Sequence, residues 1–502
     1  MFCLGCQIQY LCLLNHLSKM ASLTRFWQVG LTLSALFVSS YGCASSGDTC
    51  GKHVDCCKNS VCMSGTCQRP PVCSPDTIDW SENRVTLQGS ECRVHLRHIR
   101  DKTDGVAASI ERGVWKIWST ILLRSPSVLL ELHGLKVHLL SSQGESVYIE
   151  ANPGKISISN STITSYDPAT KKPDKRETGR AYIAALSSED GGESRMDVYL
   201  SEISYLGNDG DYHNDIEDDF GLVWKVKGFD DRDYKEVDLE LFEKVGVYGN
   251  LRKSHLHHNA MGAYCYGMKG EAVWAKNNVH NNMWVGLNPQ DNSDDMTLRK
   301  NKVHDNGWHG IEISKRCLNA VVYENKVVDN GRVGIFFHRS SNHGKAFDNF
   351  CGGNAEGDMG IFESTGIEIY DNEMIGGRYG IRLSLGAQEN HIHDNVMENN
   401  TRYGVFMYKG SDEPEASRDY NGRPRNNLFE KNTIKSPKEG QGMAIKESDG
   451  DEILNNVFKG IDSMRFDDST DTLVKKNDFD KGVEFKLENG ATLRPGSQTG
   501  TD

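Results

Sequence analysis

The middle of the chain repeats itself every 24 residues. The segments "NNVHNNMWVGL", "NKVHDNGWHGI" and "NKVVDNGRVGI" begin at Asn277, Asn301 and Asn325. Similar segments begin at Asn349, Asn372 and Asn395, and two more follow an insertion at residues 411–426. Each unit is too short for a βαβ unit and has no helical period, so it predicts one coil of a parallel β-helix. A β-propeller is the main alternative, but its blades need about 40 residues with a different signature.

Asparagine and glycine recur at fixed places in each unit. The chain has 50 glycines and only 12 prolines, a balance that is typical of many tight turns between short strands. An asparagine repeated at one position predicts a ladder of side-chain amides bonded to the turn backbone. We therefore expect an all-β protein in which a parallel β-helix follows a small disulfide-rich module.

The N-terminal residues have the pattern of a secretory signal peptide. Arg25 precedes the apolar run "WQVGLTLSALFVSS", which the small residues of "YGCASSG" follow. We expect residues 1–43 to be the signal peptide, with Met20 as an alternative start, and the mature chain to be secreted. An uncleaved signal anchor is the alternative, although the apolar run is short for a membrane span.

A cysteine-rich module is expected at residues 44–74. The stretch "CGKHVDCCKNSVCMSGTC" holds five cysteines, and Cys43 and Cys73 flank it. This density predicts a knottin-like disulfide framework in which either flanking cysteine completes the set of six. A zinc site is the alternative, but the CxxC-like pairs that it needs are missing. Residues 75–127 are expected to be a cap or linker, 128–490 the β-helix and 491–502 a tail.

Four glycines spaced 24 apart mark the register between coils: Gly262, Gly286, Gly310 and Gly334. Residues 24 apart should then lie on adjacent strands, about 4.8 Å from one another. Two columns after these glycines are apolar and are expected to point inward: Ala263, Leu287, Ile311 and Ile335, then Cys265, Pro289, Ile313 and Phe337. Because side chains alternate along a strand, the columns between them are expected to point outward.

The columns expected to point outward are polar and partly aromatic. They are Tyr264, Asn288, Glu312 and Phe336; Tyr266, Gln290, Ser314 and His338; and Gly267, Asp291, Lys315 and Arg339. Residues 296–345 carry nine Lys or Arg against four Asp or Glu, in a chain of net charge −13. This local excess predicts a groove for an anion, with a solvated run of charge as the alternative. A secreted, acidic chain without a basic module does not suit nucleic acid, so an extracellular uronate polymer is the expected partner.

The residues of this region resemble a known family. The stretch "VGLNPQDNSDDMTLRKNKVHDNGWHGIEISKRC", followed by "NGRVGIFFHRSSNHG", is similar to the mannuronan C5-epimerases, most closely the brown-algal type. The resemblance spans about residues 240–410, and "SKRC" and "HRSS" make it specific. It implies a right-handed parallel β-helix and an isomerase that converts mannuronate to guluronate within alginate. We expect the chain to act in the cell wall and without a cofactor.

The motif of that family is altered in this chain. The family has Tyr-Gly-Phe-Asp-Pro-His followed by an acid, and the matching residues are Val285, Gly286, Leu287, Asn288, Pro289, Gln290 and Asp291. Neither Gln290 nor Val285 can transfer a proton at neutral pH. By the resemblance, Arg332 matches the arginine of an "NxRxG" stretch and Lys315 matches the cation after "GIxxS".

Inverting C5 of a mannuronate needs cations on its carboxylate, a base on one face and an acid on the other. The catalytic candidates are Asn288, Gln290, Asp291, His309, Glu312, Tyr266 and His338. The candidates for substrate binding are Lys315, Arg316, Arg332, Arg339 and Tyr264. Two interpretations stay open. Either the acid and base have moved to neighbouring residues, or the chain binds alginate without catalysing its epimerisation. A polysaccharide lyase, which removes the same proton, is the enzymatic alternative.

Several of these residues also have simpler interpretations. Asp291, Asp294 and Asp295 would suit calcium, because oxygen-rich loops bind that ion, but a plain solvated loop needs no ion. His309 would serve equally as a packed turn residue. Trp284 and Trp308 repeat at 24 and are expected to be packing residues rather than sugar platforms.

Overall fold

The structure is a computed structural model that describes residues 43–57, 59–142, 146–208, 219–228, 239–411, 421–438 and 440–499. The predicted signal peptide lies outside these residues except for Cys43. Among the residues described, no helix is long and apolar enough to cross a membrane.

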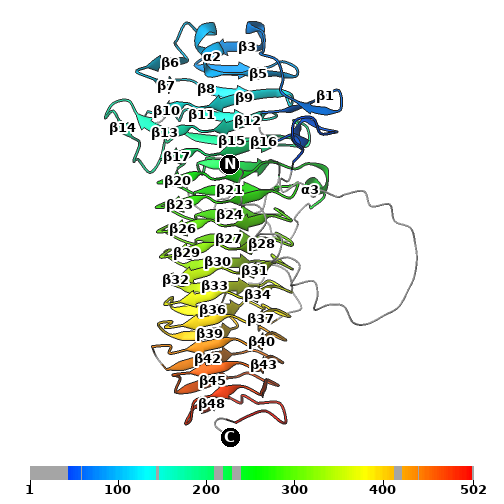
Figure 1. Ribbon diagram of the computed structural model, residues 1–502, viewed down its shortest axis with the longest axis vertical. Helices are drawn as coiled ribbons and strands as arrows, with labels where there is room; N and C mark the ends of the chain where they lie inside the picture. The colour runs from blue at the N-terminus through cyan, green and yellow to red at the C-terminus, as the bar shows by residue number, and fades with distance from the viewer. Residues whose placement is uncertain are drawn as a thin grey trace, which may run out of the picture. The chain divides into compact units, whose positions relative to one another are not determined.

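Successive coils place their strands in three long sheets, and nearly all neighbouring strands are parallel (Figure 1). Sheet 1 contains β3 (Ile78–Ser81), β4 (Arg84–Leu87), β8 (Thr120–Leu123), β11 (Tyr148–Ala151), β15 (Tyr182–Ser187), β18 (Leu222–Val226), β21 (Ala263–Tyr266), β24 (Leu287–Gln290), β27 (Ile311–Ser314), β30 (Val333–His338), β33 (Gly357–Phe362), β36 (Tyr379–Ser384), β39 (Tyr403–Tyr408), β42 (Gln441–Lys446), β45 (Ser463–Asp467) and β48 (Glu484–Glu488). The predicted all-β fold, a right-handed parallel β-helix with an N-terminal disulfide-rich part, is confirmed.

The other two sheets follow the same order along the chain. Sheet 2 contains β6 (Ala108–Glu111), β7 (Val114–Ile117), β10 (Lys136–Leu140), β13 (Thr162–Asp167), β17 (Glu202–Ser204), β20 (His255–His257), β23 (Asn278–His280), β26 (Lys302–His304), β29 (Lys326–Val328), β32 (Phe350–Gly352), β35 (Glu373–Ile375), β38 (Val396–Glu398), β41 (Thr433–Lys435), β44 (Val457–Lys459) and β47 (Asp478–Phe479), with β14 (Lys172–Pro173) beside β13. Sheet 3 contains β5 (Cys92–Val94), β9 (Val128–His133), β12 (Lys155–Ser159), β16 (Arg195–Tyr199), β19 (Leu251–Arg252), β22 (Val273–Ala275), β25 (Thr297–Arg299), β28 (Val321–Tyr323), β31 (Lys345–Phe347), β34 (Glu368–Tyr370), β37 (His391–His393), β40 (Leu428–Glu430), β43 (Glu452–Leu454) and β46 (Leu473–Lys475).

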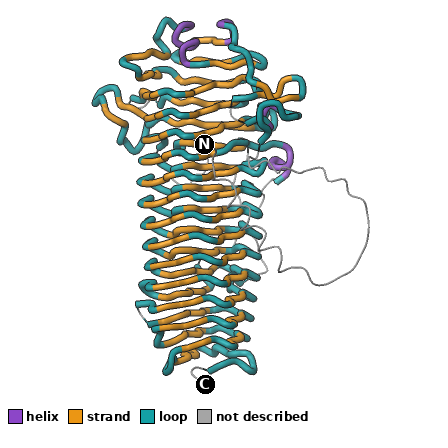
Figure 2. Tube along the Cα trace, viewed as in Figure 1, coloured by secondary structure: helices purple, strands orange, loops and turns teal. Residues whose placement is uncertain are grey.

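The described residues include a few short helices, most of them near the first coils (Figure 2). They are η2 (His53–Asp55) in the cysteine-rich module, η3 (Pro75–Thr77), α2 (Leu96–Lys102) and, further along the chain, α3 (Glu240–Lys244). In α2, Leu96 and Ile99 are buried, so this helix covers the core at the end of the stack. Parallel pairing already begins between β4 and β8 and between β5 and β9, so coils are present upstream of residue 128.

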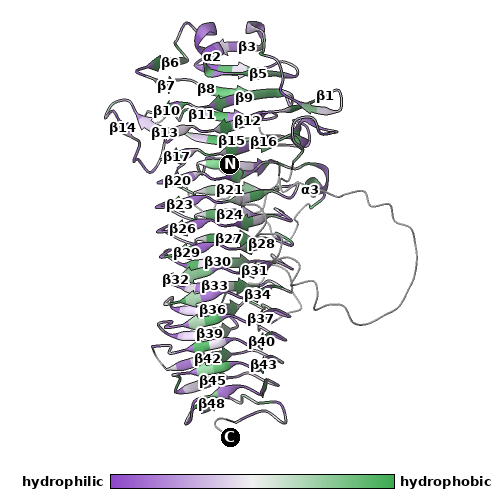
Figure 3. Cartoon of the chain, viewed as in Figure 1, coloured by the Kyte–Doolittle hydropathy of each residue, from purple (hydrophilic) through white to green (hydrophobic). Residues whose placement is uncertain are grey.

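The predicted inward columns form one continuous core. Leu287, Ile311 and Ile335 belong to the same buried hydrophobic cluster, which runs the length of the stack. Figure 3 shows the same division, with hydrophobic strands between hydrophilic turns. Gly286 is required by close packing, because a Cβ there would lie 2.6 Å from Val303 Cγ1 and 2.7 Å from the Gly310 carbonyl oxygen.

The predicted asparagine ladder is present. The side-chain Oδ1 of Asn325 accepts hydrogen bonds from the backbone N–H of Asn301 at 2.9 Å and from its Nδ2 at 3.0 Å. Asn301 Nδ2 also donates to the Trp274 carbonyl oxygen at 3.0 Å. Each amide therefore bonds one coil to the next and satisfies a turn carbonyl, which fixes the register of the stack.

A buried carboxylate completes a second ladder of this kind. Asp358 accepts hydrogen bonds from Asn354 Nδ2 at 3.0 Å, the Gly377 N–H at 3.1 Å and Asn400 Nδ2 at 3.2 Å. A Cβ on Gly377 would lie 2.6 Å from this carboxylate, so the glycine makes room for it. Burial raises the pKa of Asp358 to about 8, because the charged form loses its hydration.

The N-terminal module is a knottin-type framework. It contains the hairpin of β1 (Val61–Met63) and β2 (Thr66–Gln68). Its disulfides are Cys43–Cys57, Cys50–Cys62 and Cys56–Cys67, so Cys43 completes the set and these cysteines are not free to bind zinc. Cys73 instead forms a disulfide with Cys92 at the start of sheet 3.

Buried cations attach the module to sheet 3. The Lys155 ammonium donates to the carbonyl oxygens of Cys56 and Ser60, and Arg195 donates to the Val54 carbonyl at 2.8 Å. Burial lowers the pKa of Lys155 to about 7. The module therefore rests on polar side chains of β12 and β16 rather than on an apolar face.

Candidate active site

Most of the predicted site residues lie on, or directly before or after, three neighbouring strands of sheet 1: β24, β27 and β30. Gln290 pairs with Ser314, and Ser314 pairs with His338. Glu312 pairs with Phe336 on the next coil. The predicted register is therefore confirmed at each of these positions.

The columns that we expected to point outward are largely covered from solvent. Asn288, Gln290, Asp291 and Glu312 are all buried. Phe336 packs with Phe362, Val333 and Leu385 in a second hydrophobic cluster, separate from the main core. The outer face of sheet 1 is thus closely packed, because its aromatic, amide and charged groups contact one another across coils.

Asn288 replaces a backbone hydrogen bond that is missing from the pairing of β24 with β27. The backbone N–H groups of Leu287 and Asp291 donate to the carbonyl oxygens of Gly310 and Ser314. Residue 289 would donate to Glu312 in this series, but it is a proline and has no N–H. The Asn288 side-chain nitrogen donates to the Glu312 carbonyl oxygen at 3.1 Å instead. Its amide therefore donates a structural hydrogen bond that an ionised carboxylate could not donate.

Asp291 lies close to two cations of the next coil. The Arg316 guanidinium donates to its Oδ1, and Lys315 Nζ lies 4.0 Å from its Oδ2. Asp291, Lys315 and Arg316 all have positive φ, as expected where the chain leaves each strand. The carboxylate is fully buried, so much of the charge of these two cations is neutralised within the protein.

Glu312 and His338 form a carboxylate–imidazole pair on this face. His338 Nδ1 lies 3.3 Å from Glu312 Oε1 and 3.0 Å from Ser314 Oγ. The glutamate is buried, whereas the histidine side chain is 21% exposed. A carboxylate next to Nδ1 favours the tautomer that carries the proton there, which leaves the lone pair on Nε2.

His309 has the opposite tautomer. Its Nδ1 accepts a hydrogen bond from the Val333 N–H at 3.1 Å, so its proton is on Nε2. Burial lowers the pKa of His309 to about 4, and the imidazole is therefore neutral at neutral pH. The rings of His309 and His338 lie 4.9 and 4.8 Å from the ring of Phe336, so both imidazoles contact the phenyl group.

Arg332 and Arg339 are the more accessible cations. The Arg332 guanidinium stacks on Trp308, 4.0 Å from the ring centroid, and its Nε lies 3.8 Å from Glu356. Arg339 lies 3.5 Å from Glu363. The side chains of Arg332 and Arg339 are 42% and 20% exposed, so both have a solvent-facing part.

The nine cations counted in residues 296–345 do not form one groove. Arg299 is on sheet 3, while Lys302 and Lys326 are on sheet 2. The cations at or next to the sheet 1 strands are Lys315, Arg316, Arg332 and Arg339. The excess of positive charge counted along the sequence is divided among the three sheets, because each coil contributes a strand to all of them.

The tyrosine candidates lie deeper than expected. Tyr264 and Tyr266 are buried members of the main core, with ring contacts to Phe220 at 5.2 Å and to Phe242 at 5.7 Å. The proposed calcium ligands contact protein groups, since Asp294 accepts from the Leu318 N–H at 2.8 Å. Asp295 likewise accepts from Asn319 at 3.1 Å.

Three further charged residues belong to this face and were missed from the sequence. Arg382 stacks on Phe362 at 4.5 Å and lies 3.5 Å from Glu356. Glu363 holds Arg339. Arg382 follows Gly380 by two residues, as Glu312 follows Gly310, so extending the glycine register by two more coils would have found it.

Two families match parts of the chain: the right handed beta helix region over residues 241–350, and the periplasmic copper-binding protein (NosD) over residues 358–494. No curated protein sequence matches. Among solved structures, the periplasmic alginate epimerase AlgG aligns with a TM-score of 0.63 at 18% identity, covering 75% of this chain and 85% of its own. A double mutant of AlgG gives 0.61 at 17% identity, with the same coverage of both chains. The A-module of the mannuronan C-5 epimerase AlgE6 of Azotobacter vinelandii gives 0.35 at 16% identity, covering 82% and 91%.

The likeness to AlgG concerns the fold. The β-helix that the sequence resemblance implied is the fold that the chain shares with this alginate epimerase. At 18% identity, the activity has to be argued from the residues of the site.

Proposed function

We propose that the chain binds a uronate polymer of the alginate type along sheet 1 and exchanges the C5 proton of its mannuronate residues, as a mannuronan C5-epimerase-like isomerase. The observation that carries this proposal is the Glu312–His338 pair, which lies close to two partly exposed arginines that flank β30, Arg332 and Arg339. The fold shared with an alginate epimerase supports the choice of polymer.

The arginines would neutralise the substrate carboxylate. Arg332 is the most exposed cation of the face, and its guanidinium is oriented by Trp308. A planar guanidinium can bind a carboxylate through two hydrogen bonds. Neutralising that carboxylate makes the neighbouring C5 proton more acidic, which is the electrostatic part of the reaction.

His338 would be the base. Its Nε2 carries the lone pair because Glu312 lies at Nδ1, and the ring is partly exposed. Glu312 acts as a positioning residue, since it also stabilises the imidazolium that forms when Nε2 takes the C5 proton. Ser314, at 3.0 Å from the same nitrogen, helps to fix the ring.

The proton that returns to C5 would come from a water molecule on the other face of the sugar, and the hydroxide left behind would take the proton from the His338 imidazolium. His309 is buried and neutral, and its Nδ1 accepts the hydrogen bond from the Val333 N–H, so it would pack and orient the face rather than transfer a proton. Gln290 and Asn288 take no proton in this scheme.

Binding without turnover is the second candidate. It is favoured by the pairing of Asp291 with Lys315 and Arg316 and by the structural role of Asn288. In that case the arginines would still retain the polymer, and no proton would be exchanged.

Proton NMR of polymannuronate incubated with the purified chain separates the possibilities. Guluronate signals support the epimerase, and unsaturated chain ends identify a lyase. Retention on immobilised alginate without either product identifies a binding protein. If the double substitution Lys315→Ala and Arg339→Ala leaves retention unchanged, the face does not bind the polymer. Lys326→Ala, which removes an exposed cation of sheet 2, is the matched control.

An extracytoplasmic location accompanies this proposal. Four disulfides are typical of an oxidising compartment, and AlgG is a periplasmic protein. Secretion to an alginate-containing cell wall is the more specific form of the proposal, and immunolabelling of intact cells would test it.

A further inference from the structure

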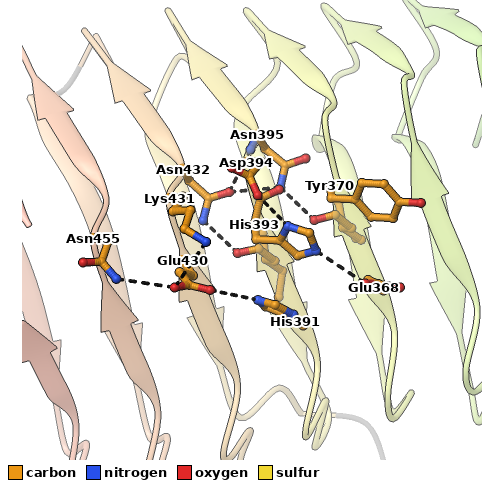
Figure 4. A network of polar contacts seen from close by, with 12 residues as sticks. Glu368, Tyr370, His391, His393, Asp394, Asn395, Glu430, Lys431, Asn432 and Asn455 are labelled. Atoms are coloured by element: carbon orange, nitrogen blue, oxygen red, sulfur yellow. Dashed lines mark hydrogen bonds and ion pairs between the residues drawn. The ribbon is translucent and has the colours of Figure 1, made fainter. Parts of the chain in front are cut away.

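A group of histidines and glutamates lies on sheet 3, away from the strands of sheet 1 that carry the candidate active site (Figure 4). Glu368 on β34 pairs in register with His391 on β37, and His393 on β37 pairs with Glu430 on β40. His391 and His393 flank the buried Ile392, so both imidazoles are on the outer face of the strand. Three successive coils therefore present two imidazoles and two carboxylates at one place.

The imidazole nitrogens are oriented for a ligand. His393 Nδ1 lies 2.8 Å from Asp394 Oδ2, which holds the proton on Nδ1 and leaves the lone pair on Nε2. The Nε2 atoms of His391 and His393 are both shielded from solvent and face carboxylate oxygens at 3.7 and 3.5 Å, which is longer than a normal hydrogen bond. Shielded nitrogens at such distances from carboxylates call for an explanation, and an ion is one of the recognised ones.

One oxygen of each glutamate faces an imidazole, and the other oxygen contacts a lysine. Glu368 Oε1 lies 3.5 Å from His393 Nε2, while its Oε2 lies 2.5 Å from Lys345 Nζ. Glu430 Oε2 lies 3.7 Å from His391 Nε2, while its Oε1 lies 3.6 Å from Lys431. Asn455 also donates to Glu430 Oε1 at 3.4 Å. These outer contacts fix the direction of the inner oxygens, as the partners of metal ligands do.

The separations suit a small divalent cation. One ligand atom each from Glu368, His391 and His393 lies within 4.8 Å of the other two. Ligands on a tetrahedral zinc ion, with bonds of about 2.1 Å, are about 3.4 Å apart. The observed nitrogen–oxygen distances of 3.5 and 3.7 Å are close to that value and too long for good hydrogen bonds.

We propose that His391, His393 and Glu368, with Glu430 as a fourth ligand, bind a divalent transition-metal ion of the zinc class. Two imidazoles and carboxylates match this class, whereas calcium and magnesium prefer all-oxygen sites. The ion joins β34, β37 and β40 across three coils and stabilises the stack there. This site is independent of the uronate chemistry proposed for sheet 1.

A second histidine cluster provides the control. His255, His257, His280 and His304 form a stripe on β20, β23 and β26 of sheet 2, where His255 and His280 contact through their Nε2 atoms at 2.5 Å. Any imidazole pair binds some zinc, so a titration of the chain needs a variant in each cluster. The Cys50, Cys56 and Cys67 group is in disulfides and does not compete.

The test is calorimetric titration of the tag-free full chain with Zn²⁺, together with the visible spectrum of its Co²⁺ form. The proposal expects that the double substitution His391→Ala and His393→Ala removes one binding event or weakens it at least tenfold. The same change should abolish the Co²⁺ absorption and the zinc-dependent rise in thermal midpoint. His280→Ala should leave that binding event, the Co²⁺ absorption and the zinc-dependent rise in thermal midpoint unchanged, whatever weaker binding it removes at its own cluster. Equal stoichiometry and affinity in the double variant and the native chain would overturn the proposal.

A second measurement needs no variant. Diethyl pyrocarbonate modifies accessible imidazoles, and peptide mapping by mass spectrometry reports each one. Zn²⁺ should protect His391 and His393 in the native chain in preference to His133, a histidine of β9 outside both clusters. Unchanged modification of His391 and His393 in saturating Zn²⁺ would refute the site even if the double variant failed to fold.

Discussion

The side-chain nitrogen of Asn288 donates to the carbonyl oxygen of Glu312 at 3.1 Å, in the place of the N–H that Pro289 lacks. An aspartate at position 288 would set a carboxylate against that carbonyl. The amide in this altered motif is therefore explained by strand pairing, and the residues that could transfer protons lie one and two coils further on.

The role of Asn288 predicts the result of restoring the acid. Asn288→Asp should lower the free energy of unfolding by about 1–3 kcal/mol, because it leaves a buried carbonyl without a donor and buries a carboxylate. Urea unfolding measures the change. The control is Asn281→Asp, since Asn281 is exposed and its side-chain oxygen accepts from His280, a contact that a carboxylate keeps. Equal stability of the Asn288→Asp variant and the native chain would contradict this role.

Polymer binding should depend on Arg332. Its guanidinium is stacked on Trp308 and is the most exposed cation of the face, so Arg332→Ala should weaken retention on alginate roughly tenfold. Arg332→Lys should restore only part of it, because an ammonium cannot bind a carboxylate through a planar pair of donors. Affinity electrophoresis in alginate gels gives both values. If Lys326→Ala reduces retention as much, the binding is a general charge effect.

The asparagine ladder should be a major source of stability. Asn306 accepts from the N–H and the Nδ2 of Asn282 and donates to Asn330 Oδ1 at 2.9 Å. Asn306→Ala leaves these buried groups without partners and should cost about 2–4 kcal/mol. Lys302→Ala, at an exposed position nearby, should cost less than about 0.5 kcal/mol in the same denaturant titration. If Asn306→Ala lowers the free energy of unfolding by less than about 1 kcal/mol, the ladder is not a major source of stability.

Asp358 predicts the direction of a pH effect on stability. Its pKa is about 8 in the folded chain, above the ordinary value of 3.8, so folding retains a proton that the unfolded chain releases. The stabilisation is complete below about pH 4 and is lost as the pH rises through 8. The stability of the native chain minus that of Asp358→Asn should therefore fall by up to a few kcal/mol from pH 4 to 8. A difference that stays constant or rises with pH would contradict this account.

The sequence was sufficient to predict the repeat and its register. The glycine at 286 and the asparagines at 301 and 325 are required by contacts between adjacent coils, and such contacts leave a period in the sequence. The knottin-type module was predictable from cysteine density. The Cys73–Cys92 disulfide was not, because its second cysteine lies outside the dense stretch.

The position of the candidate site could be predicted from the sequence, but the burial of its side chains could not. Alternation along a strand indicates which side chains leave the core, and it identified Glu312 and His338 as neighbours in space. It cannot indicate whether that outer face is itself packed, which depends on contacts such as Arg316 with Asp291 and Phe336 with Phe362. The zinc-class site was missed because its ligands come from three coils, of which one follows the insertion at 411–426.

Deuterium incorporation at C5 of polymannuronate in heavy water, measured for the native chain and for His338→Gln, shows whether His338 removes the C5 proton. We expect exchange with guluronate formation in the native chain and a loss of at least about a hundredfold in the variant, the usual size of general-base catalysis. Retention of alginate by both proteins would show that binding is intact. No exchange in the native chain, or equal exchange in the variant, would contradict the assignment of His338 as the base.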